Sequence, residues 1–166
     1  MLEGKLRMPR PVIFIHGLNS SNKGKKSIYF KERFPHMIIP HFTGSFDERM
    51  QKLYEILSQY SDIIIIGSSY GGLMATVYAM ENESKVSSLI LLAPALNILY
   101  LIDYPIRSLS TPTRIYHGIN DMVIPIAEIR DISKKIFPNL SFFEVDDDHY
   151  LYNIFYKIEW DKLLNN

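Results

Sequence analysis

A serine framed by two glycines stands where an apolar run gives way to a stretch typical of a helix. Residues 67–71 read G-S-S-Y-G and directly follow the apolar residues 63–66. The pattern G-x-S-x-G is typical of a sharp turn from a buried strand into a helix, in which small residues let the strained backbone pass close to its neighbours. Such a turn would present the Ser69 hydroxyl beyond the end of the strand, and we therefore predict that Ser69 is a nucleophile. The motif alone also fits a turn that only joins a strand to a helix.

Polar side chains also follow three other predicted strands. Residues 16–18 read H-G-L, residues 117–121 read H-G-I-N-D, and His149 follows the last predicted strand. In an open α/β sheet, ligands bind beyond the carboxyl ends of the strands, so these segments would share one edge of the sheet with Ser69. Together they contain a nucleophile, a carboxylate and a histidine in the chain order Ser69, Asp121, His149.

These three residue types can perform nucleophilic catalysis together. A serine hydroxyl is a weak nucleophile at neutral pH and needs a base within hydrogen-bond reach. Histidine titrates nearest to pH 7, which makes His149 the candidate base, and Asp121 would hold its imidazole in the required tautomer. The aspartates at residues 146–148 are competing candidates for the acid. We prefer Asp121 because sequence neighbours seldom face an imidazole correctly, and we interpret residues 146–148 as a solvated turn.

The remaining histidines and the second serine of the motif receive structural interpretations. His16 and His117 each precede a glycine at a strand end, where a side chain that bonds nearby backbone is the simpler expectation. His36 and His41 are expected on the surface or in packing contacts, and Ser68 is expected to be a buried hydroxyl beside the turn. No H-E-x-x-H pattern, G-x-G-x-x-G pattern or P-loop lysine is present, so we predict no metal and no cofactor.

Short apolar runs that alternate with helical periodicity are expected to position these residues. A capping-box pattern at Ser45 and Glu48 marks the start of one helix, and unbroken apolar runs such as residues 63–66 indicate strands that are covered on both faces. The predicted strands are residues 12–15, 37–39, 63–66, 88–93, 115–116 and 141–145; the predicted helices are 27–34, 45–57, 71–80, 126–137 and 151–164. The alternation predicts an α/β class protein, a three-layer α/β/α sandwich with a mostly parallel sheet of about six strands, in a single domain over residues 1–166.

One connection lacks any clear periodicity. Residues 94–112 join two predicted strands and are rich in leucine, isoleucine and tyrosine. A segment of this kind can plug the core, close over a site as a short lid, or form a surface for a partner. The sequence leaves these three alternatives open.

The composition excludes several classes of partner. Lysine and arginine total 18, aspartate and glutamate total 18, and there is no cysteine among the 166 residues. We therefore expect no nucleic-acid partner, no disulfide and no cysteine nucleophile. Residues 1–10 lack the apolar core of a signal peptide, and no apolar run approaches the roughly 20 residues that span a bilayer. We expect no membrane association and a cytoplasmic location.

The motifs, taken together and in order, resemble the α/β-hydrolase superfamily. The resemblance covers nearly the whole chain and depends on G-S-S-Y-G, the H-G pair after the first strand, H-G-I-N-D, and the histidine of D-D-D-H. Residues 16–21, H-G-L-N-S-S, are similar to the first loop of small bacterial esterases that lack a cap domain. The resemblance implies a minimal α/β-hydrolase fold, a Ser69-His149-Asp121 triad, and an oxyanion hole formed by the backbone N–H groups of Leu18 and Tyr70.

The function that the resemblance implies is hydrolysis of carboxylic esters of small to medium size, with thioesters as a second class, through an acyl-enzyme. The protein would act as a monomer or homodimer on a small-molecule substrate, without a cap over its site. Five residues are expected to line the substrate pocket: Leu96, Leu99, Tyr100, Met122 and Tyr150. The alternative is a non-catalytic interaction protein that keeps the fold and binds a partner through residues 94–112.

Overall fold

The computed structural model describes residues 9–165 and contains one parallel sheet. Five strands lie side by side in the order of the chain, and every neighbouring pair is parallel. They are β1 (Val12–Ile15), β2 (Ile63–Ser68), β3 (Val86–Leu92), β4 (Thr113–Gly118) and β5 (Leu140–Val145). All five carboxyl ends therefore meet at one edge, as the sequence analysis required for its candidate residues.

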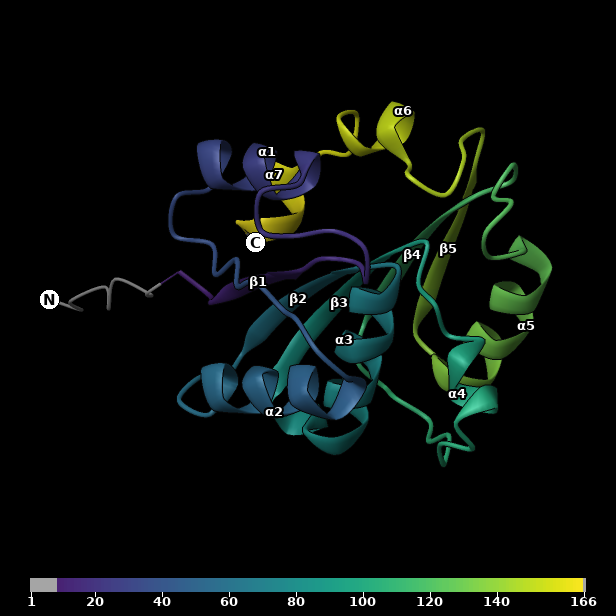
Figure 1. Ribbon diagram of the computed structural model, residues 1–166, viewed down its shortest axis with the longest axis horizontal. Helices are drawn as coiled ribbons and strands as arrows, with labels where there is room; N and C mark the ends of the chain where they lie inside the picture. The colour runs from purple at the N-terminus through teal and green to yellow at the C-terminus, as the bar shows by residue number, and fades with distance from the viewer. Residues whose placement is uncertain (1–8, 166) are drawn as a thin grey trace, which may run out of the picture.

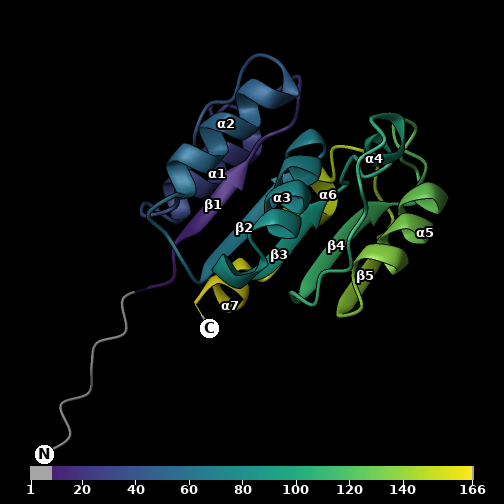
Figure 2. The same cartoon turned by 90° about the horizontal axis from the view of Figure 1, so that it is seen from below.

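Helices cover both faces of this sheet, which confirms the three-layer α/β architecture (Figure 1). One face carries α2 (Phe46–Leu57), α3 (Tyr70–Glu81), α4 (Ile98–Leu101) and α5 (Ile126–Ile136), which Figure 2 shows in front of the strands. The other face carries α1 (Lys25–Arg33), α6 (Tyr152–Phe155) and α7 (Trp160–Leu164). The chain segments on this second face lie far apart in the sequence and are brought together by packing.

The apolar run of β2 explains how the two faces are held. Ile63 and Ile65 belong to the core beneath α2, α3 and α5, whereas Ile64 and Ile66 belong to the core beneath α1, α6 and α7. Successive side chains of a strand point to opposite faces, so a strand covered on both sides needs an apolar residue at every position. The unbroken run Ile63–Ile66 is therefore the pattern of a central strand, as predicted.

The predicted strand at residues 37–39 is reduced to a single bridge, so the sheet has five strands and not six. Ile38 pairs with Ile13, its N–H donates to the Val12 carbonyl at 2.9 Å, and its carbonyl accepts from Phe14 N–H at 2.9 Å. The next donor along a parallel ladder would be residue 40. That residue is Pro40, which has no N–H, so the pairing ends after one residue.

The predicted C-terminal helix over residues 151–164 is also interrupted, and α6 and α7 take its place. The indole N–H of Trp160 donates to the Phe155 carbonyl at 2.9 Å. In a continuous helix that carbonyl would accept from residue 159 instead. Trp160 also packs on Phe30 of α1, with ring centroids 4.9 Å apart, and this buried aromatic contact favours the break.

Local signals elsewhere in the chain are confirmed. The helix α2 begins with the predicted capping box: Glu48 N–H donates to the Ser45 hydroxyl at 3.2 Å, and Ser45 N–H donates to the Glu48 carboxylate at 2.7 Å. The Ser45 hydroxyl and the Glu48 carboxylate thus each accept from a backbone N–H that would be unpaired at a helix start without a capping box. The capping box positions the helix that packs beside α3.

The segment 94–112 acts in part as a core plug. Leu96, Leu99 and Leu109 are fully buried in the core on the α3 side of the sheet. The short helix α4 nevertheless leaves Leu101 81% exposed. Burial of these three leucines explains part of the apolar content of the segment, and the lid and partner-surface alternatives stay untested.

No helix within residues 9–165 is long and apolar enough to cross a membrane. The absence of a signal core was expected for residues 1–10, and residues 1–8 lie outside the described part of the chain. The single-domain organisation stays a prediction.

Candidate active site

The turn after β2 has the strained backbone that the G-x-S-x-G pattern predicts. Ser69 has φ 53° and ψ −115°, a left-handed conformation that is costly for a residue with a side chain. Its N–H donates to the Leu92 carbonyl at 2.8 Å, and its carbonyl accepts from Ala95 N–H at 3.0 Å. The end of β3 therefore holds the strained residue in place.

The flanking glycines leave no space for a side chain. A Cβ added to Gly71 would lie 2.1 Å from the Ile15 carbonyl oxygen, and one added to Gly67 would lie 2.4 Å from the Gly71 carbonyl oxygen. Both distances are far below van der Waals contact with backbone that cannot move aside. Glycine at these positions lets α3 begin directly against the ends of β1 and β2.

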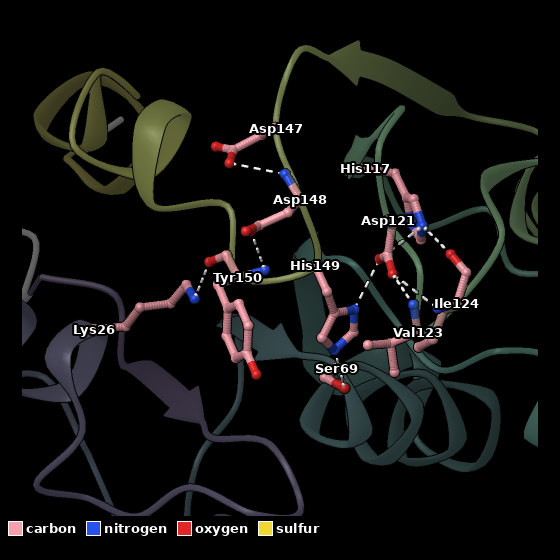
Figure 3. Close-up of polar contacts among 10 residues, drawn as sticks. All are labelled: Lys26, Ser69, His117, Asp121, Val123, Ile124, Asp147, Asp148, His149 and Tyr150. Atoms are coloured by element: carbon pink, nitrogen blue, oxygen red, sulfur yellow. Dashed lines mark hydrogen bonds and ion pairs between the residues drawn. The ribbon is translucent and has the colours of Figure 1, made fainter.

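The three candidate catalytic side chains lie in one hydrogen-bonded row (Figure 3). His149 Nε2 is 3.0 Å from Ser69 Oγ, and His149 Nδ1 is 2.7 Å from Asp121 Oδ2. An ionised carboxylate only accepts hydrogen bonds, so Nδ1 carries the proton and Nε2 is free to accept from the serine hydroxyl. The Asp121 side chain is fully buried, whereas that of His149 is 13% exposed. This arrangement can activate Ser69 as a nucleophile.

Asp121 is held by several donors in addition to His149. Its Oδ1 accepts from Val123 N–H at 2.9 Å and from Ile124 N–H at 2.8 Å. His117 Nε2 lies 2.9 Å from the Ile124 carbonyl oxygen, to which its N–H donates, and 3.2 Å from Asp121 Oδ2. Burial lowers the pKa of His117, which favours its neutral form. The expectation that His117 bonds nearby backbone is confirmed, but its contact with Asp121 was missed.

The interpretation of residues 146–148 as a solvated turn is wrong for Asp147. Asp147 is 5% exposed, and its carboxylate accepts from the N–H groups of Asp148, Asn153 and Ile154, each at 2.9 Å. The Asn153 side-chain amide adds a longer contact at 3.4 Å. These donors occupy the carboxylate and fix the loop that carries His149. A run of three aspartates has no periodicity that would have revealed which one points inward.

His16 organises the loop that contains Leu18. Its Nε2 accepts from Phe42 N–H at 2.9 Å, so Nδ1 carries the proton and donates to the Gly17 carbonyl at 2.7 Å. Burial lowers the pKa of His16, which agrees with a neutral ring between one donor and one acceptor. His41 stacks on this ring at a centroid distance of 5.4 Å. His16 is therefore structural, as expected, and His36 is exposed.

Arg49 lies beneath both residues that were predicted to supply the oxyanion donors. Its Nε donates to the Gly44 carbonyl at 3.0 Å, its Nη2 donates to the Leu18 carbonyl at 3.4 Å, and its guanidinium lies 5.6 Å from the Tyr70 ring centroid. The side chain is 5% exposed, and its Nη1 has no hydrogen-bond partner among residues 9–165. Arg49 was not predicted as a site residue, although its position four residues before Leu53 places it on the buried side of α2.

A cavity of about 570 Å³ opens beside Ser69 and His149. Leu18, Tyr70 and Tyr150, all named in the sequence analysis, contribute to its wall. Residues that were not expected there include Lys25, Lys26, Ile98 and Tyr152. The cavity combines apolar, aromatic and cationic side chains and is wide enough for a small organic molecule.

Four of the five expected pocket residues do not line this cavity. Leu96 and Leu99 point into the core and are fully buried. Met122 is 93% exposed, and the neighbouring Val123 and Ile124 form the wall instead. Tyr100 of α4 is exposed, and Lys135 donates to its hydroxyl at 3.2 Å. Side-chain direction in these irregular loops follows from packing and has no periodic signal in the sequence.

Two smaller findings complete the site. Ser68, expected to be buried, is half-buried and lines the cavity beside Ser69. Within the part of the chain that the structure describes, no group of three or more His, Cys, Asp or Glu side chains is arranged to hold a metal ion.

Comparisons with known proteins identify the same architecture. Residues 43–105, which include Ser69 but neither Asp121 nor His149, match the family model described as the alpha/beta hydrolase fold. A search of curated proteins found no match.

Many solved structures resemble this chain. A putative YdeN-like hydrolase from Pectobacterium atrosepticum is 20% identical with a TM-score of 0.74, and the match covers 95% of this chain and 94% of that one. Mouse alpha/beta hydrolase domain-containing protein 10 is 19% identical with a TM-score of 0.74, covering 98% and 92%. Est1E from Butyrivibrio proteoclasticus, in a structure with bound ferulic acid, is 16% identical with a TM-score of 0.72, covering 94% and 89%. At these identities the likeness establishes the fold.

Proposed function

Because this chain has the α/β-hydrolase fold, we propose that it is a serine hydrolase that cleaves carboxylic esters, with thioesters as a second substrate class. The observation that carries the proposal is the continuous hydrogen-bonded row from Asp121 through His149 to Ser69, at 2.7 Å and 3.0 Å, on the wall of an open cavity. A turn that only joined a strand to a helix would need neither the base nor the buried carboxylate.

The reaction would begin with attack of Ser69 Oγ on the ester carbonyl carbon while His149 Nε2 takes the hydroxyl proton. Asp121 stabilises the resulting imidazolium, and the carbonyl oxygen becomes an oxyanion. Collapse of the tetrahedral intermediate breaks the bond to the alcohol, which leaves with the proton from His149, and an acyl-serine remains. Water then attacks the acyl-serine, with His149 again as base, and releases the carboxylic acid and free Ser69.

The oxyanion would be bound by the backbone N–H groups of Tyr70 and Leu18. Tyr70 is the first residue of α3, and an N–H in the first turn of a helix has no acceptor within that helix. The positive end of the helix dipole favours negative charge at this place. One such donor contributes on the order of 3 kcal/mol to transition-state stabilisation in comparable sites.

The competing function is a non-catalytic interaction protein, for which the exposed Leu101 and its neighbours Tyr100 and Ile102 would form the contact surface. The two functions differ in covalent reactivity. A fluorophosphonate probe should label the wild-type protein, and short p-nitrophenyl esters should be hydrolysed. Neither reaction should occur with Ser69→Ala, for which we expect kcat to fall by about 10⁶ if the triad acts as a unit.

The adjacent hydroxyl supplies the matched control. Ser68→Ala removes the neighbouring serine of the same turn and should still be labelled at Ser69, which peptide mapping can identify. A folded wild-type protein that neither reacts with the probe nor hydrolyses esters would refute the hydrolase and favour the interaction protein. A cytoplasmic location and a monomeric or homodimeric state stay predictions from the sequence.

A further inference from the structure

The cavity beside Ser69 has a positive wall, although the chain as a whole carries no net charge. Lys25 and Lys26, from the first turn of α1, both line it. No aspartate or glutamate is among the lining residues of this cavity within residues 9–165. A cavity with cations and no acidic residue favours ligands that carry negative charge.

Lys26 is fixed close to the catalytic loop. Its Nζ donates to the Tyr150 carbonyl at 2.5 Å (Figure 3). The same atom lies 4.7 Å from the Tyr152 ring centroid. Burial lowers the pKa of Lys26 to about 8, with a partial opposing effect from Asp147 and Asp148. The cost of burying this ammonium is thus only partly offset within the protein.

The nearby acidic residues do not neutralise Lys26 directly. In the described chain, no carboxylate lies within ion-pair distance of it. Asp147 accepts from backbone groups of its own loop, and Asp148 accepts from Tyr150 N–H at 2.8 Å. The ammonium therefore retains hydrogen atoms that a ligand could use.

Lys25 places a second ammonium at the same aromatic ring. Its Nζ also lies 4.7 Å from the Tyr152 ring centroid, and Lys25 is exposed. Two like charges close to one ring repel each other, and an anion bound near them would offset part of this repulsion. Charge-assisted hydrogen bonds to a carboxylate are also stronger than those to a neutral carbonyl.

Building on the proposed hydrolase, we propose that the substrate is an ester bearing an anionic group, and that Lys26 and Lys25 bind this group while the ester carbonyl reaches Ser69. Because Lys26 is bonded to the residue after His149, the anion would be bound next to the loop that carries the catalytic base. The ligand class is thus a carboxylate-bearing or phosphate-bearing ester, and not a simple neutral ester.

The test compares kcat/KM for matched pairs of anionic and neutral esters. Mono-p-nitrophenyl glutarate and p-nitrophenyl pentanoate place the charge on the acyl side. The pair of 4-acetoxybenzoate and its methyl ester places it on the leaving group. In at least one pair we expect the wild-type protein to prefer the anionic ester by roughly tenfold to a hundredfold, and the preference should shrink with added salt.

Variants on one helix separate the role of Lys26 from charge in general. Lys26→Met should abolish most of the preference, and Lys26→Arg should restore part of it. Lys25→Glu, at an exposed position, should lower the ratio as well. Lys31→Met is the matched control, because Lys31 is on the same helix but does not line the cavity, and it should leave the ratio unchanged.

A binding measurement keeps this inference separate from the hydrolase proposal. Calorimetry with the Ser69→Ala variant should detect binding of glutarate or of inorganic phosphate. Adding Lys26→Met to this variant should lower the affinity for the more tightly bound of the two anions at least tenfold. Equal kcat/KM within both ester pairs, together with fluorophosphonate labelling, would overturn the anion site and leave the hydrolase intact. If the protein neither turns over an ester nor reacts with the fluorophosphonate probe, the proposed function fails, and the calorimetric result alone decides whether Lys26 binds anions.

Discussion

Replacement of Asp147 by alanine should destabilise the loop that carries His149. The Asp147 carboxylate accepts from three backbone N–H groups at 2.9 Å, two of which belong to the first turn of α6. Alanine would leave these donors without their acceptor in a place where the carboxylate is only 5% exposed.

The expected magnitude follows from these contacts. A hydrogen bond to a charged group contributes about 1.5–3 kcal/mol, and loss of a helix-capping side chain costs about 0.5–2 kcal/mol. Water can reach part of the site, because Asn153 is exposed, so the contributions do not add fully. We expect Asp147→Ala to lower the free energy of unfolding by about 3 kcal/mol and the melting temperature by roughly 6–12 °C.

Calorimetry or thermal circular dichroism can measure this, and Asp146→Ala supplies the control. Asp146 is exposed and accepts one hydrogen bond, from the Asn120 side chain at 2.9 Å, so its removal should cost less than about 0.5 kcal/mol. Activity of Asp147→Ala should fall as well, because the imidazole of His149 would lose its fixed position. Equal melting temperatures for the two variants would show that the carboxylate of Asp147 does not hold the loop, and our reasoning would be wrong.

Three further predictions concern the site. Asp121→Asn should lower kcat by orders of magnitude, because an amide cannot hold His149 in the tautomer that accepts from serine. Ester hydrolysis assays measure this loss, and a much smaller loss would contradict the role of Asp121. Arg49→Met should lower kcat on the order of tenfold by loosening the loop at residue 18. The melting temperature should stay equal or rise, because the substitution removes a buried cation that has no carboxylate partner among residues 9–165. Burial lowers the pKa of His16 below 6.5, so the unfolded chain binds a proton that the folded chain does not, and stability present above pH 6.5 is lost as the pH falls. His16→Gln, whose amide oxygen can still accept from Phe42 N–H, should show a weaker loss in acid denaturation profiles; an unchanged profile would contradict a buried neutral His16.

The sequence was informative wherever a local pattern has one physical solution. The glycines at 67 and 71 predict the strained turn because any side chain there would collide with backbone. The parallel topology then predicts that His149 and Asp121 meet Ser69, since the carboxyl ends of parallel strands share one edge. The structure places the three side chains in hydrogen-bond contact, although their catalytic role stays to be tested.

The sequence was uninformative wherever direction is decided by packing. Leu96 and Leu99 are apolar residues in an aperiodic segment, and whether they face the core or the cavity depends on how α4 packs against the sheet. Asp147 is identical in type to both neighbours, and only the three-dimensional turn selects it as the buried one. The strand at residues 37–39 was overestimated because the missing N–H of Pro40 matters only once its pairing partner is known.

Trp160, described above as the residue that interrupts the C-terminal helix, gives the protein a built-in optical reporter. It is the only tryptophan of the chain and is almost fully buried against Phe30 and Phe155. Its emission therefore reports on the layer formed by α1, α6 and α7, while the core beneath α2, α3 and α5 contributes no indole signal. Comparison of fluorescence with circular dichroism during unfolding would reveal whether the layer that bears Lys25 and Lys26 melts together with the rest of the sheet or before it.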